Sequence, residues 1–414
     1  MADQEREYDV ILWGASGFTG KLTAEYLLQH YGVGGELRWA LGGRNEQKLQ
    51  DVRTRLSEAD ASASELPLVV GDSDDGAFLD AMVQRATVVC TTVGPYAKYG
   101  AKLVGACAAR GTHYCDLTGE AHFMRRMIDA HQQAARDSGA RIVFTCGFDS
   151  IPSDLGTLFV QDEMRRRHGV AAASVRYRVV GMRGGASGGT IASAMNMMEE
   201  AATDPSVLEV MDAPYSLNPA DQQQGPDQAE RNTGWYDEAF GQWVMPFVMG
   251  VINTKVVRRS NALLDYAWGK EFRYDEGVLS GDGPGGWLKS AAASSAAIVG
   301  RGAMGAGPIR RLIASRVPQP GTGPSKRARE AGYFTVELWA EHPEDADKAL
   351  RARVTGDRDP GYGSTSKMLA ESAVCLAKDA VSVGGGMWTP ASAMGSMLIE
   401  RLQQRAGLTF ELLD

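Results

Sequence analysis

Short apolar runs rich in β-branched residues alternate with longer amphipathic stretches over about the first third of the chain. The apolar runs predict strands at 8–13, 37–41, 66–70, 87–92, 112–116 and 141–145, and the amphipathic stretches predict helices at 18–31, 46–58, 75–85, 100–110 and 121–138. Near-continuous apolar strands separated by helices are typical of a parallel sheet that is covered on both faces. We therefore expect an α/β doubly wound sheet of the Rossmann type, with ligands at the carboxyl ends of its strands.

The rhythm changes after residue 150. The later pattern predicts helices at 151–168, 190–202, 364–376 and 389–404, strands at 175–181, 263–272, 332–342 and 348–355, and a long polar loop at 204–234. Strands without regular intervening helices are typical of a mixed sheet in a second, α+β domain. We expect a Rossmann domain at 1–155, a mixed-sheet domain for substrate binding or dimerisation at 156–358, and C-terminal helices at 359–414.

A glycine-rich turn joins the first predicted strand to the first predicted helix. It reads Gly-Ala-Ser-Gly-Phe-Thr-Gly over residues 14–20. Such a turn lets the backbone approach a pyrophosphate, which then meets the unpaired N–H groups of the helix N-terminus. The spacing alone is a weak signal, but its place at the first strand–helix junction makes it specific. The predicted cofactor contacts here are Gly14, Ser16, Gly17, Phe18, Thr19 and Gly20.

The end of the second predicted strand indicates which nucleotide binds. An NAD site places an acid there for the ribose 2′-hydroxyl, whereas this chain has Gly-Gly-Arg-Asn at 42–45. The guanidinium of Arg44 can fork onto a 2′-phosphate, with Asn45 beside it and Lys48 one helical turn further. These residues favour NADP(H), and the alternative is that Arg44 is a solvated residue at a helix start.

Two further strand ends carry candidate cofactor contacts. Asp72 follows the third strand and is placed to reach the adenine amino group, or else to hold a turn. The fourth strand ends in a run that normally lies beside the ribose and nicotinamide. Its predicted contacts are Val93, Gly94, Pro95 and Tyr96.

Charge and composition narrow the function classes. The formal net charge of −8 argues against nucleic-acid binding. The first residues lack a signal sequence, no apolar run is long enough to span a bilayer, and the histidines and cysteines form no metal motif, so we expect a cytoplasmic chain without a metal. However, residues 287–329 hold eight Lys and Arg residues and no acid. This basic segment favours contact with a membrane surface or an acidic carrier protein, or is a solvated loop.

Several runs together resemble the saccharopine-dehydrogenase-like oxidoreductases, and within them the trans-acting enoyl reductases. They are the glycine-rich turn at 14–20 and the runs at 42–45, 93–96, 99–100, 113–120, 147–154, 360–365 and 384–395. The resemblance implies an NADP-binding Rossmann domain, a mixed-sheet domain, and a C-terminal end that packs back on the first domain.

Reduction by hydride transfer also needs a proton donor or an oxyanion stabiliser. The candidates at the later strand ends are Tyr96, Asp116 and Asp149, whose alternative roles are packing for the tyrosine and helix capping for the two acids. We expect an NADPH-dependent reductase that reduces the enoyl C=C bond of a lipid or polyketide acyl substrate. The acyl group is expected to be a carrier-bound thioester, and the enzyme is expected to be a homodimer. The alternatives are a saccharopine-type amine oxidoreductase and a non-catalytic, lipid-associated NADP-binding protein.

Overall fold

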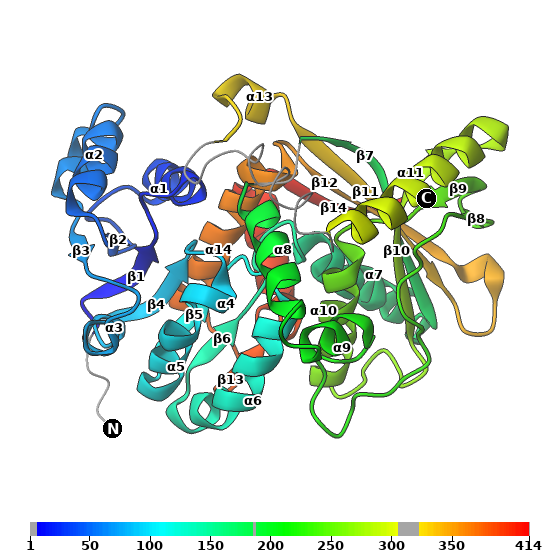
Figure 1. The fold of residues 1–414 in the computed structure, drawn as a ribbon, viewed down its shortest axis with the longest axis horizontal. Coiled ribbons are helices and arrows are strands. Elements are labelled where there is room, and N and C mark those ends of the chain that lie inside the picture. The colour runs from blue at the N-terminus through cyan, green and yellow to red at the C-terminus, as the bar shows by residue number, and fades with distance from the viewer. Residues whose placement is uncertain (1–5, 185–187, 305–322, 414) are drawn as a thin grey trace.

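The described residues form two seven-stranded sheets with helices packed around them (Figure 1). The computed structural model describes residues 6–184, 188–304 and 323–413. All strands of the first sheet are parallel, in the order β13-β6-β5-β4-β1-β2-β3. They are β1 (Tyr8–Trp13), β2 (Trp39–Gly43), β3 (Leu68–Val70), β4 (Ala86–Thr91), β5 (His113–Cys115), β6 (Arg141–Val143) and β13 (Gly386–Trp388). The predicted six-strand doubly wound sheet is confirmed, with β13 as an added seventh strand.

Helices bury both faces of this sheet. Val10 and Leu12 of β1 pack in one apolar cluster, and their neighbours Ile11 and Trp13 pack in another. The first cluster contains residues of α1 (Phe18–Tyr31), α2 (Glu46–Ser57) and α14 (Thr365–Lys378). The second contains residues of α3 (Gly76–Val83), the short α4 (Tyr96–Tyr99), α5 (Ala101–Arg110) and α6 (Ala121–Ser138). This two-sided burial explains why the strands are apolar at nearly every position.

The second sheet is mixed, in the order β14-β12-β11-β7-β10-β9-β8. Among the neighbouring strands that the structure describes in this sheet, only β7 and β10 pair in parallel. Its strands are β7 (Ser174–Arg183), β8 (Trp235–Asp237), β9 (Gln242–Met245), β10 (Arg273–Gly281), β11 (Tyr333–Glu341), β12 (Leu350–Gly356) and β14 (Leu408–Leu413). α7 (Ile151–His168) and α10 (Gly250–Leu263) pack against one face. This architecture confirms the expected α+β mixed-sheet unit.

The remaining helices connect or cover the two sheets. They are α8 (Gly188–Ala201), α9 (Ser206–Asp212), α11 (Gly283–Met304), α13 (Lys326–Glu330), α15 (Pro390–Ala393), α16 (Gly395–Arg405) and the short turns of helix at Ala61–Glu65, Ala346–Lys348 and Pro360–Ser364. α7 follows β6 after a turn at 144–150 and contacts β11 and β12 of the second sheet. The carboxyl edge of the first sheet therefore faces the second sheet's helices.

Three secondary-structure predictions are wrong. The strand predicted at 263–272 is the end of α10 and a turn in which Asp265 and Tyr266 have positive φ, and the true strand begins at Arg273. The predicted loop at 204–234 contains α9, and the helix predicted at 389–404 is split by Gly395, whose φ is +52°. The apolar run at 263–272 misled because Trp268 and Phe272 fill the core from a turn.

The C-terminal part of the chain contributes to both sheets. α14 and β13 pack on the first sheet, as the resemblance implied, whereas β14 pairs with β12 of the second. The domain limits at 155 and 358 therefore stay a prediction. Residues 305–322 of the basic segment at 287–329, including Arg310, Arg311 and Arg316, lie outside the described residues. Among the residues that are described, no helix is both long and apolar enough to cross a membrane.

Candidate active site

The glycine-rich turn after β1 has a geometry that only glycine permits. Gly14 has a φ of +91°, and a Cβ atom there would lie 2.8 Å from Thr92 Oγ1. A Cβ atom on Gly20 would lie 2.2 Å from the carbonyl oxygen of Gly14, so α1 can approach the turn this closely only without a side chain. Gly17 is the N-cap residue of α1 and offers no side chain to cap the helix. This uncapped helix start beside a bare backbone fits a pyrophosphate.

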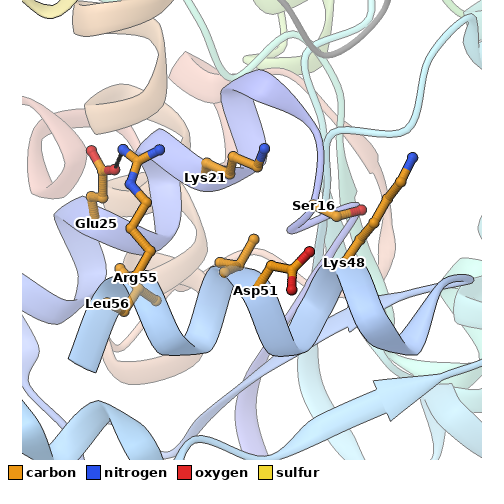
Figure 2. A pocket seen from close by; sticks show the side chains of 8 residues that line it. Ser16, Lys21, Glu25, Lys48, Asp51, Arg55 and Leu56 are labelled. Atoms are coloured by element: carbon orange, nitrogen blue, oxygen red, sulfur yellow. Dashed lines mark hydrogen bonds and ion pairs between the residues drawn. The ribbon is translucent and has the colours of Figure 1, made fainter. Parts of the chain in front are cut away.

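A cleft of about 400 Å³ lies beside this turn, between α1 and α2. Ser16 and Lys48, both predicted cofactor contacts, line it together with Lys21 (Figure 2). Arg55, also on its wall, is paired with Glu25. Lys21 was missed in the sequence. Its signal is a basic residue one helical turn after Gly17, on the face that turns toward α2.

The end of β2 carries no acid. The side chain of Arg44 is exposed and makes no hydrogen bond or ion pair with any other described residue. In contrast, Asn45 caps α2, because its Oδ1 accepts from the amide of Lys48 at 2.9 Å. The free guanidinium of Arg44 and the ammonium groups of Lys21 and Lys48 fit the 2′-phosphate of NADP(H).

The turn after β4 lies against the glycine-rich turn. Thr92 Oγ1 donates to the carbonyl oxygen of Gly14 at 3.1 Å, and Val93 Cγ2 would lie 2.8 Å from a Cβ atom on Gly14. The Gly94–Pro95 peptide bond that follows is cis. The structure thus brings these two predicted groups of cofactor contacts together at one edge. Asp72 makes a different contact: its carboxylate holds a turn by accepting from the amide of Asp74 at 2.9 Å.

Tyr96 is buried, and its hydroxyl is engaged on both sides. The hydroxyl donates to the carbonyl oxygen of Thr91 at 3.3 Å and accepts from the amide of Leu117 at 3.2 Å. A phenol has one proton to donate. In this arrangement that proton serves the packing of β4 against the segment after β5, which is the alternative role that the sequence left open.

Asp116 is buried at the end of β5 with three donors around its carboxylate. The Tyr114 hydroxyl lies at 2.8 Å, and the amides of Thr118 and Thr145 each lie at 3.1 Å. Burial raises the pKa of Asp116 to about 7 despite these hydrogen bonds. Because its contacts join the ends of β5 and β6, the carboxylate shapes the edge of the sheet.

Asp149 differs from the other two candidates. It follows β6 and precedes α7, and its carboxylate makes no hydrogen bond or ion pair within the described part of the chain. Burial alone raises the pKa of Asp149 to about 7. A partly accessible acid with this pKa at the carboxyl edge has the properties of a proton donor near neutral pH.

The described residues contain no group of three or more His, Cys, Asp and Glu side chains that could hold a metal ion. The polar groups that do gather at the carboxyl edge belong to the turns after β1, β2, β4, β5 and β6. Their arrangement suits a bound dinucleotide.

Comparisons with known proteins agree with this architecture. Residues 10–143 match the family model of the saccharopine dehydrogenase NADP binding domain. The chain is 42% identical to a Mycobacterium tuberculosis protein provisionally named a trans-acting enoyl reductase, over 97% of both chains. It is 40% identical to the trans-acting enoyl reductase of Mycobacterium ulcerans, over 98% of this chain and 97% of that one.

A solved structure shares the fold at much lower identity. Apo saccharopine dehydrogenase (L-Glu forming) from Saccharomyces cerevisiae aligns over 98% of this chain and 100% of its own, with a TM-score of 0.53 and 11% identity. The likeness supports the two-sheet fold alone. The family model and the full-length relatives place this protein among the NAD(P)-dependent oxidoreductases that bind NADP(H). The chain belongs to the trans-acting enoyl reductase family of saccharopine-dehydrogenase-like proteins.

Proposed function

We propose that this protein reduces the C=C bond of an enoyl thioester in a lipid or polyketide acyl chain, with NADPH as the reductant. The full-length relatives at about 40% identity that are named enoyl reductases support this reaction. The observation that carries the proposal in the structure is Asp149, an acid without a protein partner among the described residues at the carboxyl edge of the nucleotide-binding sheet.

The residues of the first sheet divide the binding of NADPH between them. We assign the pyrophosphate to the backbone of Gly14, Gly17 and Gly20, together with Ser16. The 2′-phosphate meets Arg44 and Lys48, and Lys21, which lines the same cleft as Lys48, adds a third positive charge. The turn at 93–95 packs beside the nicotinamide. When it is bound there, the cofactor supplies a hydride.

Asp149 supplies the proton in this proposal. A hydride adds to Cβ of the enoyl group, the C=C π pair becomes the enolate, and a proton must reach Cα to give the saturated thioester. The carboxyl of Asp149 holds that proton, since its pKa of about 7 keeps it largely protonated in mildly acidic solution. Solvent then returns a proton to the carboxylate after each turnover.

The pH dependence of the reaction tests this role. Protonated Asp149 is the active form, so kcat/KM with NADPH and an enoyl thioester should fall as the pH rises through about 7. Asp149→Asn should lower kcat by about 10²-fold or more and remove that limb of the profile. NADPH binding, followed by its fluorescence, should be unchanged. A normal kcat in Asp149→Asn would refute the role of the residue, and no oxidation of NADPH by any enoyl thioester would refute the reaction.

The fold match keeps a saccharopine-type amine oxidoreductase as the second candidate. An imine substrate would accept the same hydride at carbon. Transfer of label from C4-deuterated NADPH into a panel of enoyl, keto and imine acceptors separates the two reductases. A chain that binds NADPH and transfers label to none of them is the non-catalytic NADP-binding protein.

Delivery of the acyl group concerns the basic segment at 287–329. The described end of this segment lies close to the cofactor turn, since the Arg329 guanidinium sits 5.4 Å from the ring centre of Phe18. Delivery by an acidic carrier protein would fit this charge. Carrier docking, contact with a membrane and a homodimer all stay predictions.

A further inference from the structure

One buried carboxylate, that of Glu120, accepts hydrogen bonds both from the turn after β4 and from α8. Glu120 is 1% exposed, and its Oε1 and Oε2 accept from the amides of Tyr96 at 2.8 Å and Ala97 at 2.9 Å. Its Oε1 also accepts from the hydroxyl of Ser193 at 2.6 Å. Tyr96 and Ala97 begin α4, directly after the Gly94–Pro95 bond, whereas Ser193 lies in α8. The position of that turn and the position of α8 are therefore set by the same side chain.

The first residue of α8 is fixed to the other cofactor turn. The amide of Gly188 donates to the hydroxyl of Tyr362 at 2.7 Å. The Tyr362 ring in turn packs edge-on against Phe18 of the glycine-rich turn, with 4.7 Å between ring centres. The N-terminal half of α8 thus reaches from the turn after β1 to the turn after β4, and both turns lie at the carboxyl edge of the first sheet.

The far end of α8 and the turn that follows it also contact α6 through polar groups. Arg126 of α6 pairs with Glu200 and with Asp204, each at 3.0 Å. α8 itself is only partly buried at most positions, and it stands between the first sheet and the second (Figure 1). Hydrogen bonds and ion pairs, rather than a large apolar contact, hold it in place. Such a contact can be lost and remade at low free energy.

We propose that Glu120 is a positioning residue that couples the nicotinamide-side turn to α8, so that α8 forms a wall of the substrate site when the cofactor orders that turn. This inference rests on the proposed function, because the turn at 93–95 is assigned to the nicotinamide there. Glu120 touches neither the cofactor nor the substrate in this scheme. It acts through the two amides of α4 and through Ser193.

Two substitutions at Ser193 separate this coupling from a general structural role. Ser193→Ala removes only the α8 contact and leaves both α4 amides bonded to Glu120. Ser193→Thr keeps a hydroxyl and should restore the contact. Glu199→Gln is the control on the same helix, since Glu199 is exposed and makes no hydrogen bond or ion pair to a described residue.

Steady-state kinetics should split in a defined way. Ser193→Ala should raise the KM for the enoyl thioester about fivefold or more, and its kcat and the Kd of NADPH should change by less than about twofold. Ser193→Thr and Glu199→Gln should stay within about twofold of the wild type in all three constants. Glu120→Gln should weaken NADPH binding as well, because an amide group accepts at only one of its two polar atoms. Equal kinetic constants in Ser193→Ala and the wild type would overturn the coupling.

Hydrogen exchange tests the coupling without turnover. Binding of NADPH should protect the amides of α8 in the wild type, and this added protection should be lost in Ser193→Ala although NADPH still binds. If no enoyl thioester is reduced but the difference in protection is present, the proposed reaction fails and the coupling stands. If α8 gains no protection in the wild type, or the same protection in Ser193→Ala, the coupling fails whatever the reaction is.

Discussion

The two sheets of this protein have the same number of strands, but they differ in where their polar side chains lie. The first sheet is buried on both faces, and its polar candidates lie beyond the strand ends. The second sheet alternates: in β12, Leu350, Ala352 and Val354 point into the core, and Arg351 and Arg353 point outward. A parallel sheet that is covered on both faces leaves only its carboxyl edge for chemistry. A sheet with one open face can hold charges along its whole length.

Single carboxylates show the same contrast. Beside the first sheet, Glu371 of α14 is fully buried. It accepts from the hydroxyls of Tyr26 and Tyr31 at 2.8 Å, and Arg401 lies at 3.3 Å. The carboxylate of Glu371 thus links α14 and α16 to α1. In the second, Glu337 of β11 is also buried, but its arginine partners are about two-fifths exposed. The difference between these two glutamates can be measured directly.

Glu371→Ala should have the largest effect on stability. It leaves the hydroxyls of buried Tyr26 and half-buried Tyr31 without this acceptor, and Arg401 without one of its two carboxylate partners, the other being Asp379. Removal of one member of such a buried group costs about 3–5 kcal/mol. The free energy of unfolding from urea titration should fall by that amount.

Glu400→Ala on the neighbouring α16 is the matched control, since Glu400 is exposed. Its effect should stay below about 0.5 kcal/mol. A loss in Glu371→Ala no larger than that of the control would show that the C-terminal helices do not depend on this carboxylate.

The two sheets also differ in how far the sequence predicts them. All six strands of the predicted parallel sheet are present, because two-sided burial makes each strand a continuous apolar run between helices. The second region gave a false strand at 263–272 and no sign of α10. Nearly every residue of α10 is buried, including Asn253 and Arg258, so it lacks the polar stripe that marks an amphipathic helix.

The candidate site shows the same limit. The glycine-rich turn and Arg44 could be predicted because their signal lies in a few adjacent residues. What Tyr96 and Asp116 do could not, because their hydrogen-bond partners come from other strand ends. The contact between Glu120 and Ser193 joins residues 73 positions apart, which no local pattern announces.

Arg44→Ala tests whether residues beside the first sheet alone bind the 2′-phosphate of the nucleotide. Loss of one forked contact to a 2′-phosphate should weaken NADPH about 10–30-fold and leave NADH binding nearly unchanged. Arg351→Ala, an outward-facing arginine on β12, is the control and should alter neither affinity. Titration of nucleotide fluorescence measures both. Equal losses for NADPH and NADH in Arg44→Ala would place the 2′-phosphate elsewhere.

Glu337→Ala should have a smaller effect than either Glu371→Ala or Arg44→Ala. The carboxylate accepts from Arg351 Nε at 2.7 Å and from Arg353 Nη2 at 2.9 Å, but water reaches both guanidinium groups and solvates them when the acid is removed. Exposed pairs are worth up to about 1 kcal/mol, so the free energy of unfolding should fall by about that much. The loss should also shrink in high salt, which screens charges on an open face more than those inside a buried cluster. A salt-independent loss as large as that of Glu371→Ala would mean that the outer face of the second sheet is covered in solution, as it would be in a dimer formed through that face.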